Sequence, residues 1–411
     1  MREEQGRIIE NQIFAKEENA KEEKPLKVKA AARDSAKDVR ETKDEKTKDV
    51  KDTKDVREEN DDSIIGALKL VAPGTSLREG LDSVLRAKTG GLIVIGDSEE
   101  IMRLVEGGFL LNAEYTPPNL YELAKMDGAI VLSKDAKRIL YANAQLIPDS
   151  SSPSRETGIR HRTAERMAKQ TNALVIAISQ RRGVISLYRG ANRYSLQEIG
   201  VLLSKANQAI QTLEKYKRVL DKALVNLTAL EFEDLVTVYD VVLVVQRGEM
   251  VLRIVRELNN YISELGTEGR LIIMQVEELV TNIQDELTHV VRDYLESGNK
   301  KAEDVLQSIA NWSADDLLEP ANFSRVLGWG SSASVLDESI HPRGYRILQR
   351  IPRLPAPVID NLVHSFDSFQ SLLKASIEDL DEVEGIGEVR AKNIRNGLRR
   401  LQDQVMLERY M

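Results

Sequence analysis

The chain has 411 residues, a formal net charge of −8 and no cysteine. This length allows two or three domains with separate cores. The lack of cysteine excludes disulfides, thiolate metal sites and cysteine nucleophiles. The acidic balance excludes a uniformly basic nucleic-acid binder, so any contact with DNA must come from a local patch. No stretch approaches the roughly 20 apolar residues of a membrane span, which predicts a soluble, cytoplasmic protein without membrane contact.

Residues 1–60 are rich in Lys, Glu, Asp and Arg and poor in large apolar side chains. Such a segment cannot offset its ordering entropy by burial, which predicts disorder or transient helix. The triplet Lys-Asp-Val starts at positions 37, 48 and 54. The first two copies are eleven residues apart, a spacing that a charged helix can follow. The alternative is therefore a charged helical arm that binds a partner.

Residues 61–195 alternate short apolar runs with helical stretches, which predicts an α/β domain with a mixed sheet flanked by helices. Strands are expected at residues 92–95, 129–132, 174–178 and 184–188. Residues 163–170 are typical of a helix.

Two short motifs in this domain suggest chemistry on a nucleotide. Asp127-Gly128-Ala129 stands at the entrance of a predicted strand, where a carboxylate can hold Mg²⁺ or Mn²⁺ and a glycine lets backbone approach a ligand. Some thirty residues on, a cluster from Arg160 to Thr163 (RHRT) opens a predicted helix. Guanidinium groups beside a helix N-terminus suit phosphate oxygens. Alone, the first motif is more often a plain turn, and the second is more often a solvated basic helix start.

Residues 196–340 are expected to form an all-α spine that separates two functional ends and packs in an oligomer. Ser195 with Glu198, and Thr228 with Glu231, have the spacing of capping boxes at helix starts. Residues 236–245 are rich in β-branched side chains, so helix and strand both remain open there. Apolar positions recur at roughly heptad spacing at Ile199, Leu202, Ala206, Ile210, Leu213, Val219, Leu220, Leu224 and Leu227.

Residues 341–411 are predicted to form a tandem helix-hairpin-helix DNA-binding domain. Gly385, Ile386 and Gly387 separate two helical stretches, with Ala391 and Ile394 expected to face inward. Amide N–H groups at the second helix start can bind a DNA phosphate without reading sequence. Residues 351–366 indicate a second hairpin in which prolines replace the glycines. The alternative is a hairpin that serves only protein packing.

Two runs of basic residues in this region contain no acid and predict locally positive stripes. The first run holds Arg390, Lys392, Arg395, Arg399 and Arg400, and the second holds Arg343, Arg346, Arg350 and Arg353. Scattered histidines without ligand spacing are expected on the surface or in packing, and both tryptophans in the middle region are expected to pack. These residues are His289, His341, His364, Trp312 and Trp329.

Residues 90–97, 107–133, 160–188 and 343–355 resemble the DNA integrity scanning family of bacteria, from residue 64 to the C-terminus. The family's enzymes are diadenylate cyclases, which join two ATP molecules into cyclic di-AMP. The resemblance implies that Asp127 is catalytic and binds the metal. It also implies an ATP site at Gly128, Ala129, Leu146, Ile159, Arg160, His161, Arg162, Thr163 and Ser179. Ile159 departs from the family, which usually has Thr there, so a hydroxyl contact to phosphate is lost.

The resemblance further implies a homo-octamer in which two chains face each other and react their ATP molecules across the interface. It implies that branched DNA, such as a Holliday junction, binds at Gly385, Ile386, Gly387, Arg390 and Lys392 and lowers synthesis. Two rival hypotheses remain. One is a DNA-repair adaptor with an inactive nucleotide fold, and the other is a nucleotidyltransferase that adenylylates a macromolecule.

Overall fold

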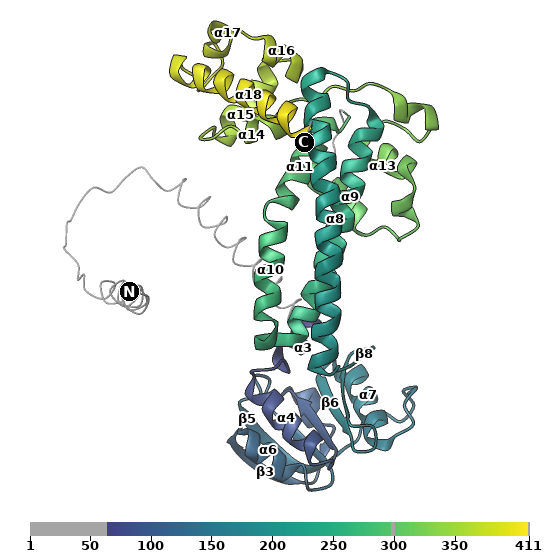
Figure 1. Cartoon of the computed structure of the whole chain (residues 1–411). Helices are drawn as coiled ribbons and strands as arrows, with labels where there is room; N and C mark the ends of the chain where they lie inside the picture. Colours follow the sequence, from purple (N-terminus) through teal and green to yellow (C-terminus); the bar gives the residue numbers. More distant parts are fainter. Residues whose placement is uncertain (1–63, 297–300, 410–411) are drawn as a thin grey trace, which may run out of the picture. The chain divides into compact units, whose positions relative to one another are not determined.

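The computed structural model describes residues 64–296 and 301–409, so the predictions for residues 1–60 lie outside the described residues. The described part begins with a mixed-sheet domain, and the elements that follow it are helices (Figure 1). This confirms the predicted fold class.

One mixed sheet has the strand order β2-β5-β4-β1-β6-β7-β8, with β3 paired to β5. Strands β1 and β4 are parallel, and the other pairs are antiparallel. The strands are β1 (Gly91–Ile95), β2 (Val105–Glu106), β3 (Phe109–Glu114), β4 (Ala129–Leu132), β5 (Arg138–Leu146), β6 (Leu174–Ser179), β7 (Val184–Arg189) and β8 (Asn192–Ser195). The four predicted strands are confirmed as β1, β4, β6 and β7.

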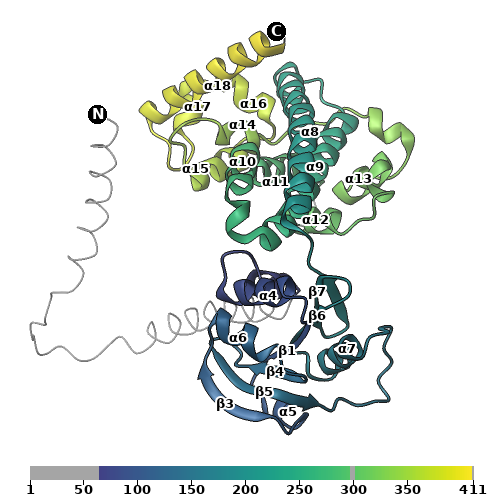
Figure 2. The ribbon, with the colours of Figure 1, turned by 60° about the horizontal axis from the view of Figure 1, so that its bottom comes forward.

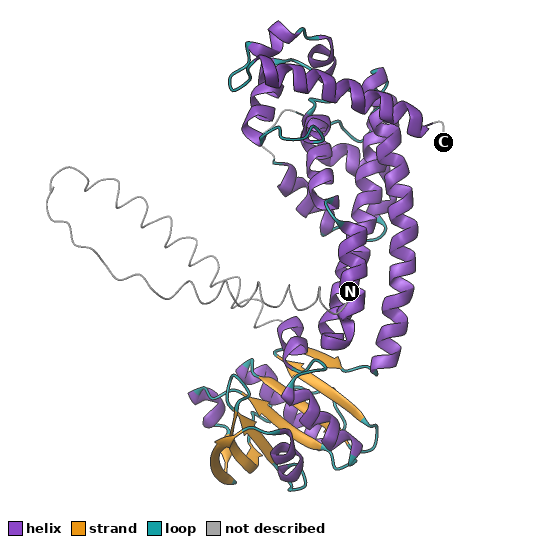
Figure 3. Ribbon diagram, turned by 60° about the vertical axis from the view of Figure 1, so that its left-hand side comes forward, coloured by secondary structure: helices purple, strands orange, loops and turns teal. Residues whose placement is uncertain are grey.

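Helices cover both faces of this sheet (Figures 2 and 3). Successive strand residues point to opposite faces, so the burial of all five β1 residues requires cover on both sides. Ile93 shares a core with helices α4 and α6, whereas Val94 shares one with α5 and α7. The helices are α3 (Ile64–Leu70), α4 (Ser76–Arg86), α5 (Glu99–Met102), α6 (Pro117–Leu123) and α7 (Ile159–Thr171).

Two long helices, α8 (Ile199–Glu233) and α9 (Val238–Leu265), lie side by side (Figures 1 and 3). Leu202, Ala206, Ile210 and Leu213 are buried in their shared core, at the three- and four-residue steps of an apolar helix face. Val219 departs from the predicted stripe, because 43% of its surface is exposed. The β-branched run that left helix and strand open is the start of α9.

Both predicted capping boxes are wrong. Ser195 is the last residue of β8, and α8 begins after Glu198 without a side-chain cap. Thr228 lies inside α8 and donates its hydroxyl to the Leu224 carbonyl at 2.7 Å, a back-bond that threonine makes within helices. A capping box instead joins Thr237 to residue 240 at the start of α9.

The rest of the middle region consists of short helical segments packed against α8 and α9. Trp312 meets Phe323 edge-on with ring centroids 5.0 Å apart, and the Trp329 ring N–H donates to the Tyr294 carbonyl at 2.8 Å. The expected packing of both tryptophans is therefore confirmed. The segments are η1 (Gly266–Gly269), α10 (Arg270–Val280), α11 (Ile283–Tyr294), α12 (Ala302–Ala310), η2 (Asp316–Leu318), α13 (Pro320–Leu327) and η3 (Ala333–Asp337).

Five helices form the C-terminal region around a third core. Ala391 and Ile394 are fully buried, as predicted. Phe232 of α8 belongs to the same core and meets Phe369 edge-on at 5.5 Å. The C-terminal region therefore shares its core with α8. Its helices are α14 (Tyr345–Gln349), α15 (Ala356–Ser365), α16 (Phe369–Lys374), α17 (Ile377–Asp381) and α18 (Glu388–Arg409).

Within residues 64–296 and 301–409, no helix has both the length and the apolar character needed to cross a bilayer.

Candidate functional site

The two sequence motifs meet at one edge of the sheet. Asp127 Oδ1 lies 3.5 Å from Arg160 Nη2, although 33 residues separate them. The Asp127 side chain is fully exposed, and that of Arg160 is 39% exposed. Solvent screens the charges of an exposed pair of this kind, so the pair adds little to stability. Both groups therefore remain accessible to a ligand.

Two glycines give this edge its shape. Gly128 has φ +91°, and a Cβ there would lie 2.8 Å from the Ala144 carbonyl oxygen of β5. Glycine is thus required at position 128 because this residue packs closely against the β5 backbone. The sequence had instead predicted that the glycine allows the backbone to approach a ligand. Gly90 has φ +75°, and a Cβ there would lie 2.9 Å from Arg160 Nη1. Gly90, which is not among the predicted site residues, makes room for this guanidinium group.

The basic cluster forms the first turn of α7. Gly158 is the N-cap residue, and no side chain caps the helix. The first intrahelical bond runs from Arg162 N–H to the Gly158 carbonyl at 2.9 Å. The amide N–H groups of Ile159, Arg160 and His161 consequently lack helical partners. Three free amides beside guanidinium groups form an anion-binding arrangement.

The other predicted nucleotide residues differ in how accessible they are. Ala129 and Leu146 are buried in the core between the sheet and α7, with 1% and 8% of their surfaces exposed. Their side chains therefore belong to the core of the domain. Ser179 ends β6, and its hydroxyl accepts from the Arg182 N–H at 3.2 Å. Thr163 is half-buried on α7, one turn from the helix start.

A hydrogen-bonded chain behind His161 was missed by sequence reasoning. His161 Nδ1 lies 3.0 Å from the Tyr188 hydroxyl, which donates to Glu156 Oε1 at 3.0 Å. Arg193 Nη1 pairs with the same carboxylate oxygen at 2.9 Å. These residues come from α7, β7, β8 and the loop before α7, so no spacing in the sequence links them.

A divalent metal fits the exposed carboxylate of Asp127. Among the described residues, no three His, Asp or Glu side chains gather into a metal-binding group. Mg²⁺ commonly uses one or two carboxylates and completes its shell with water and substrate phosphates. A lone accessible carboxylate beside a helix start with free amide N–H groups meets that need.

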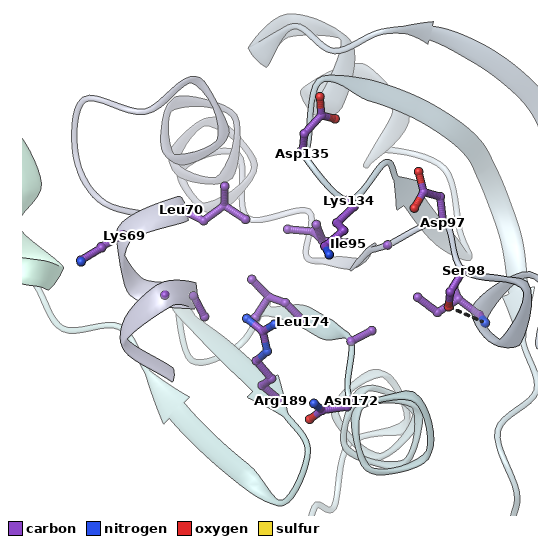
Figure 4. Close-up of a pocket in the computed structure, with 15 residues that line it drawn as sticks. Lys69, Leu70, Ile95, Asp97, Ser98, Lys134, Asp135, Asn172, Leu174 and Arg189 are labelled. Carbon is purple, nitrogen blue, oxygen red and sulfur yellow. Dashed lines mark hydrogen bonds between the residues drawn. The ribbon is translucent and has the colours of Figure 1, made fainter. Parts of the chain in front are cut away.

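A cavity of 550 Å³ lies at the opposite edge of the sheet (Figure 4). Its wall includes Ile95, the last residue of β1, Lys134, which follows β4, and Leu174 at the start of β6. Asp127 instead precedes the entrance of β4. None of the predicted ATP-binding residues lines this cavity, so it is separate from the candidate site.

The predicted DNA-binding turn joins α17 to α18. Gly385 has φ +82°, whereas a Cβ on Gly387 would meet nothing within 4 Å. Gly387 caps α18 through its carbonyl, which accepts from the Ala391 N–H at 2.9 Å. The N–H groups of the first turn of α18 are therefore free of helical partners. Ile386 is buried, and its N–H donates to the Val383 carbonyl. Ile386 therefore stabilises the turn by packing and does not face solvent.

The two predicted basic stripes differ. Arg390 Nη1 donates to the Gly385 carbonyl, and exposed Lys392 pairs with Glu388 at 2.5 Å. In the second stripe, Arg350 and Arg353 are exposed, but Arg346 is fully buried. The prediction of Arg346 as surface charge is wrong. It pairs with two carboxylates of the spine, Glu231 and Glu286.

Two family models match the chain. The DisA bacterial checkpoint controller nucleotide-binding model covers residues 78–193, and the DisA bacterial checkpoint controller linker-region model covers residues 196–336. A DNA integrity scanning protein DisA from Carboxydothermus hydrogenoformans is 62% identical over 84% of this chain and 98% of its own length. Another from Clostridium botulinum is 54% identical over 86% of this chain and its full length. The chain belongs to the DisA family.

A third relative, from Acetivibrio thermocellus, is 53% identical over 85% of this chain and 97% of its own length. The predicted family is thus confirmed, and with it the diadenylate cyclase activity. The nucleotide-binding match spans both Asp127 and the Arg160 cluster. The rival hypothesis of an inactive nucleotide fold finds no support in these matches.

Proposed function

We propose that ATP binds with its triphosphate over the first turn of α7. The observation that carries this proposal is the 3.5 Å approach of Asp127 to Arg160 at an exposed edge of the sheet, beside three free amides. Arg160, His161 and Arg162 would bind phosphate oxygens together with those amides. Charge-assisted hydrogen bonds of this kind contribute about 1.5–3 kcal/mol each. The backbone at Gly128, Ala129 and Leu146 would line the nucleoside, and Thr163 and Ser179 the phosphates.

Asp127 would hold Mg²⁺ or Mn²⁺ against the phosphates. The metal, when bound, supplies charge neutralisation to the phosphate oxygens. The 3′-hydroxyl oxygen of one ATP gives up its proton to water and bonds to the α-phosphorus of the other ATP, while the bond between that phosphorus and the departing pyrophosphate breaks. The 3′-hydroxyl of the second ATP then attacks the α-phosphorus of the first in the same way. This step closes the ring and releases the second pyrophosphate. Arg160 and Arg162 would stabilise the charge that develops on the departing pyrophosphate.

Two chains must face each other for this reaction, because each chain carries one such edge. Exposed apolar side chains on β3 support contact between chains, because β3 pairs with β5, the same strand that pairs with β4 next to Asp127. Phe109, Leu110 and Leu111 are 56%, 69% and 40% exposed. We therefore propose a homo-oligomer, and the family resemblance favours an octamer.

We also propose that the C-terminal helices form a tandem helix-hairpin-helix that binds DNA through phosphates. A groove of 470 Å³ lies between the two turns, bounded by residues 351–354 on one side and residues 387–390 and 393–394 on the other. Arg353, Arg390 and the free amides of α18 supply positive charge and donors there. Such contacts carry no sequence preference. They suit branched DNA such as a Holliday junction, whose binding would lower cyclic di-AMP synthesis in DNA integrity signalling. Both ATP and DNA are cytoplasmic partners in bacteria, so we place the protein in the cytoplasm.

Product analysis after incubation with ATP and Mg²⁺ or Mn²⁺ tests the first proposal. Cyclic di-AMP and pyrophosphate should form in a ratio of one to two in the wild type. The products should be absent in Asp127→Asn, while Arg160→Ala should weaken ATP binding. Label transferred from ATP to a protein or nucleic acid instead would favour the rival nucleotidyltransferase.

A further inference from the structure

The imidazole of His161 is the first link of a buried polar chain. Its Nδ1 contacts the Tyr188 hydroxyl, which contacts Glu156, which in turn pairs with Arg193, at 3.0, 3.0 and 2.9 Å. Only 1% of the Tyr188 surface and 10% of the Glu156 side chain are exposed. Polar contacts shielded from water in this way are directional and strongly coupled.

Donor and acceptor roles along this chain follow from its charged end. The Glu156 carboxylate is paired with Arg193 and accepts a hydrogen bond from the Tyr188 hydroxyl. Burial and the Glu156 carboxylate raise the pKa of Tyr188 far above its usual value, so the phenol keeps its proton. The Tyr188 oxygen must then accept from His161. His161 therefore carries a proton on Nδ1, and Nε2 is the ring nitrogen left for a ligand.

The Cδ2 atom of the His161 ring lies close to the start of α7. Cδ2 of His161, which is bonded to Nε2, lies 3.5 Å from the point where a Cβ on Gly158 would stand. Gly158 is the N-cap residue of α7, and the free amides follow it. Nε2 thus lies beside the surface proposed for the triphosphate.

The charges around His161 favour its neutral form when no anion is bound. Burial lowers its pKa below the usual value, and the positive charges of Arg193, Arg182 and Arg160 lower it further, while Glu156 opposes them. A neutral Nε2 carries a lone pair, which repels a phosphate oxygen. A protonated Nε2 donates to it.

We propose that binding of ATP draws one proton from solvent onto Nε2 of His161, and that Glu156, acting through Tyr188, stabilises the imidazolium that forms. The inference rests on the proposed placement of ATP at α7. Glu156 and Tyr188 act as positioning residues, since neither needs to touch the nucleotide. Affinity for ATP should be highest at low pH and should decline as pH rises through the pKa of His161 in the complex. The reason is that the proton required for binding becomes scarcer in solution as pH rises.

Calorimetry with 3′-deoxyadenosine triphosphate and saturating Mg²⁺ tests this, because the probe lacks the hydroxyl that reacts. Titrations at one pH in buffers of different ionisation enthalpy give the number of protons taken up. The wild type should take up a substantial fraction of one proton. Tyr188→Phe and Glu156→Gln should abolish most of that uptake and weaken binding roughly tenfold, the scale of one charge-assisted hydrogen bond.

Tyr194→Phe is the matched control. Tyr194, on β8, donates to Glu264 at 2.6 Å and so makes the same kind of tyrosine–glutamate bond without contacting His161. It should leave proton uptake unchanged. Unchanged uptake in Tyr188→Phe and Glu156→Gln, both shown to be folded by circular dichroism, would overturn the proposal.

The Arg160→Ala variant distinguishes failure of this inference from failure of the proposed ATP site at α7. If Arg160→Ala leaves the affinity for the probe unchanged, ATP does not bind at α7 and the proposed site itself fails. If Arg160→Ala weakens binding but the wild type takes up no proton, the ATP site stands and the role of His161 alone is refuted.

Discussion

Arg346 joins the C-terminal region to the spine through buried charges, and its removal should destabilise the protein strongly. Its guanidinium contacts Glu231, donates to Thr228 at 3.0 Å and pairs with Glu286 at 3.1 Å. Arg346 and Glu231 are both fully buried. Nearby, Asp293 accepts the Gly344, Tyr345 and Arg346 N–H groups at 2.8, 2.6 and 2.9 Å.

Arg346→Met keeps the side-chain bulk but leaves the Glu231 carboxylate buried without its cation. Loss of one partner from a buried pair costs about 3–5 kcal/mol in the free energy of unfolding. At about 2–4 °C per kcal/mol for a unit of some 150–250 residues, the melting temperature should fall by about 6–20 °C. Urea unfolding followed by circular dichroism measures the change as a lower midpoint at an unchanged slope.

Arg350→Met, one turn further along at an exposed position, is the matched control and should change stability by less than about 0.5 kcal/mol. Adding Glu231→Gln to Arg346→Met should restore part of the loss, because the buried charge is then removed. A cost below about 1 kcal/mol for Arg346→Met alone would refute the reasoning, since it would mean that water reaches Glu231.

Three further predictions concern the two functional ends. Asp127→Asn should lower cyclic di-AMP synthesis by about 100-fold or more while leaving thermal stability unchanged, because its side chain is fully exposed. Gly387→Ala should weaken DNA binding in a gel-shift assay without loss of stability, because its Cβ enters open space, whereas Gly385→Ala should cost about 1–2 kcal/mol in a thermal melt through its positive φ. DNA affinity should fall steeply with salt and vary little with base sequence, and Lys392→Gln should reduce the salt slope by about 1.

The sequence predicted those strands whose side chains are buried on both faces. β1 and β4 are continuous apolar runs because helices cover both sides of them. β3 and β8 carry exposed or half-exposed residues throughout, so no apolar run marks them. Strand prediction from hydrophobicity therefore found β1, β4, β6 and β7. It missed the exposed strands, and it also missed β5, which is paired on both sides but has several exposed or half-exposed residues.

Contacts between distant residues set the limit of prediction at the candidate sites. Glu156 lies 32 residues from Tyr188, and Arg346 lies 115 residues from Glu231. A count of charges along the chain cannot distinguish an arginine that meets solvent from one that meets a buried carboxylate. The Arg160 cluster was recognisable because its members are adjacent in sequence and open one helix.

The buried contacts of Arg346 with Glu231 and Glu286, which join the C-terminal region to the spine, also decide how coupling between DNA and the cyclase can be tested. We call these contacts the joint. Deleting residues 341–411 would strip Glu231 of its cation, leave Asp293 without its amide donors and expose Phe232. Any change in activity would then mix lost DNA binding with a damaged spine. Substitutions on the exposed face of the turn, such as Gly387→Ala, leave the joint intact. If DNA acts through the spine, a four-way junction should inhibit the wild type and fail to inhibit that variant, while synthesis without DNA stays equal. Equal inhibition of both would show that DNA acts elsewhere, for instance by competing at the ATP site.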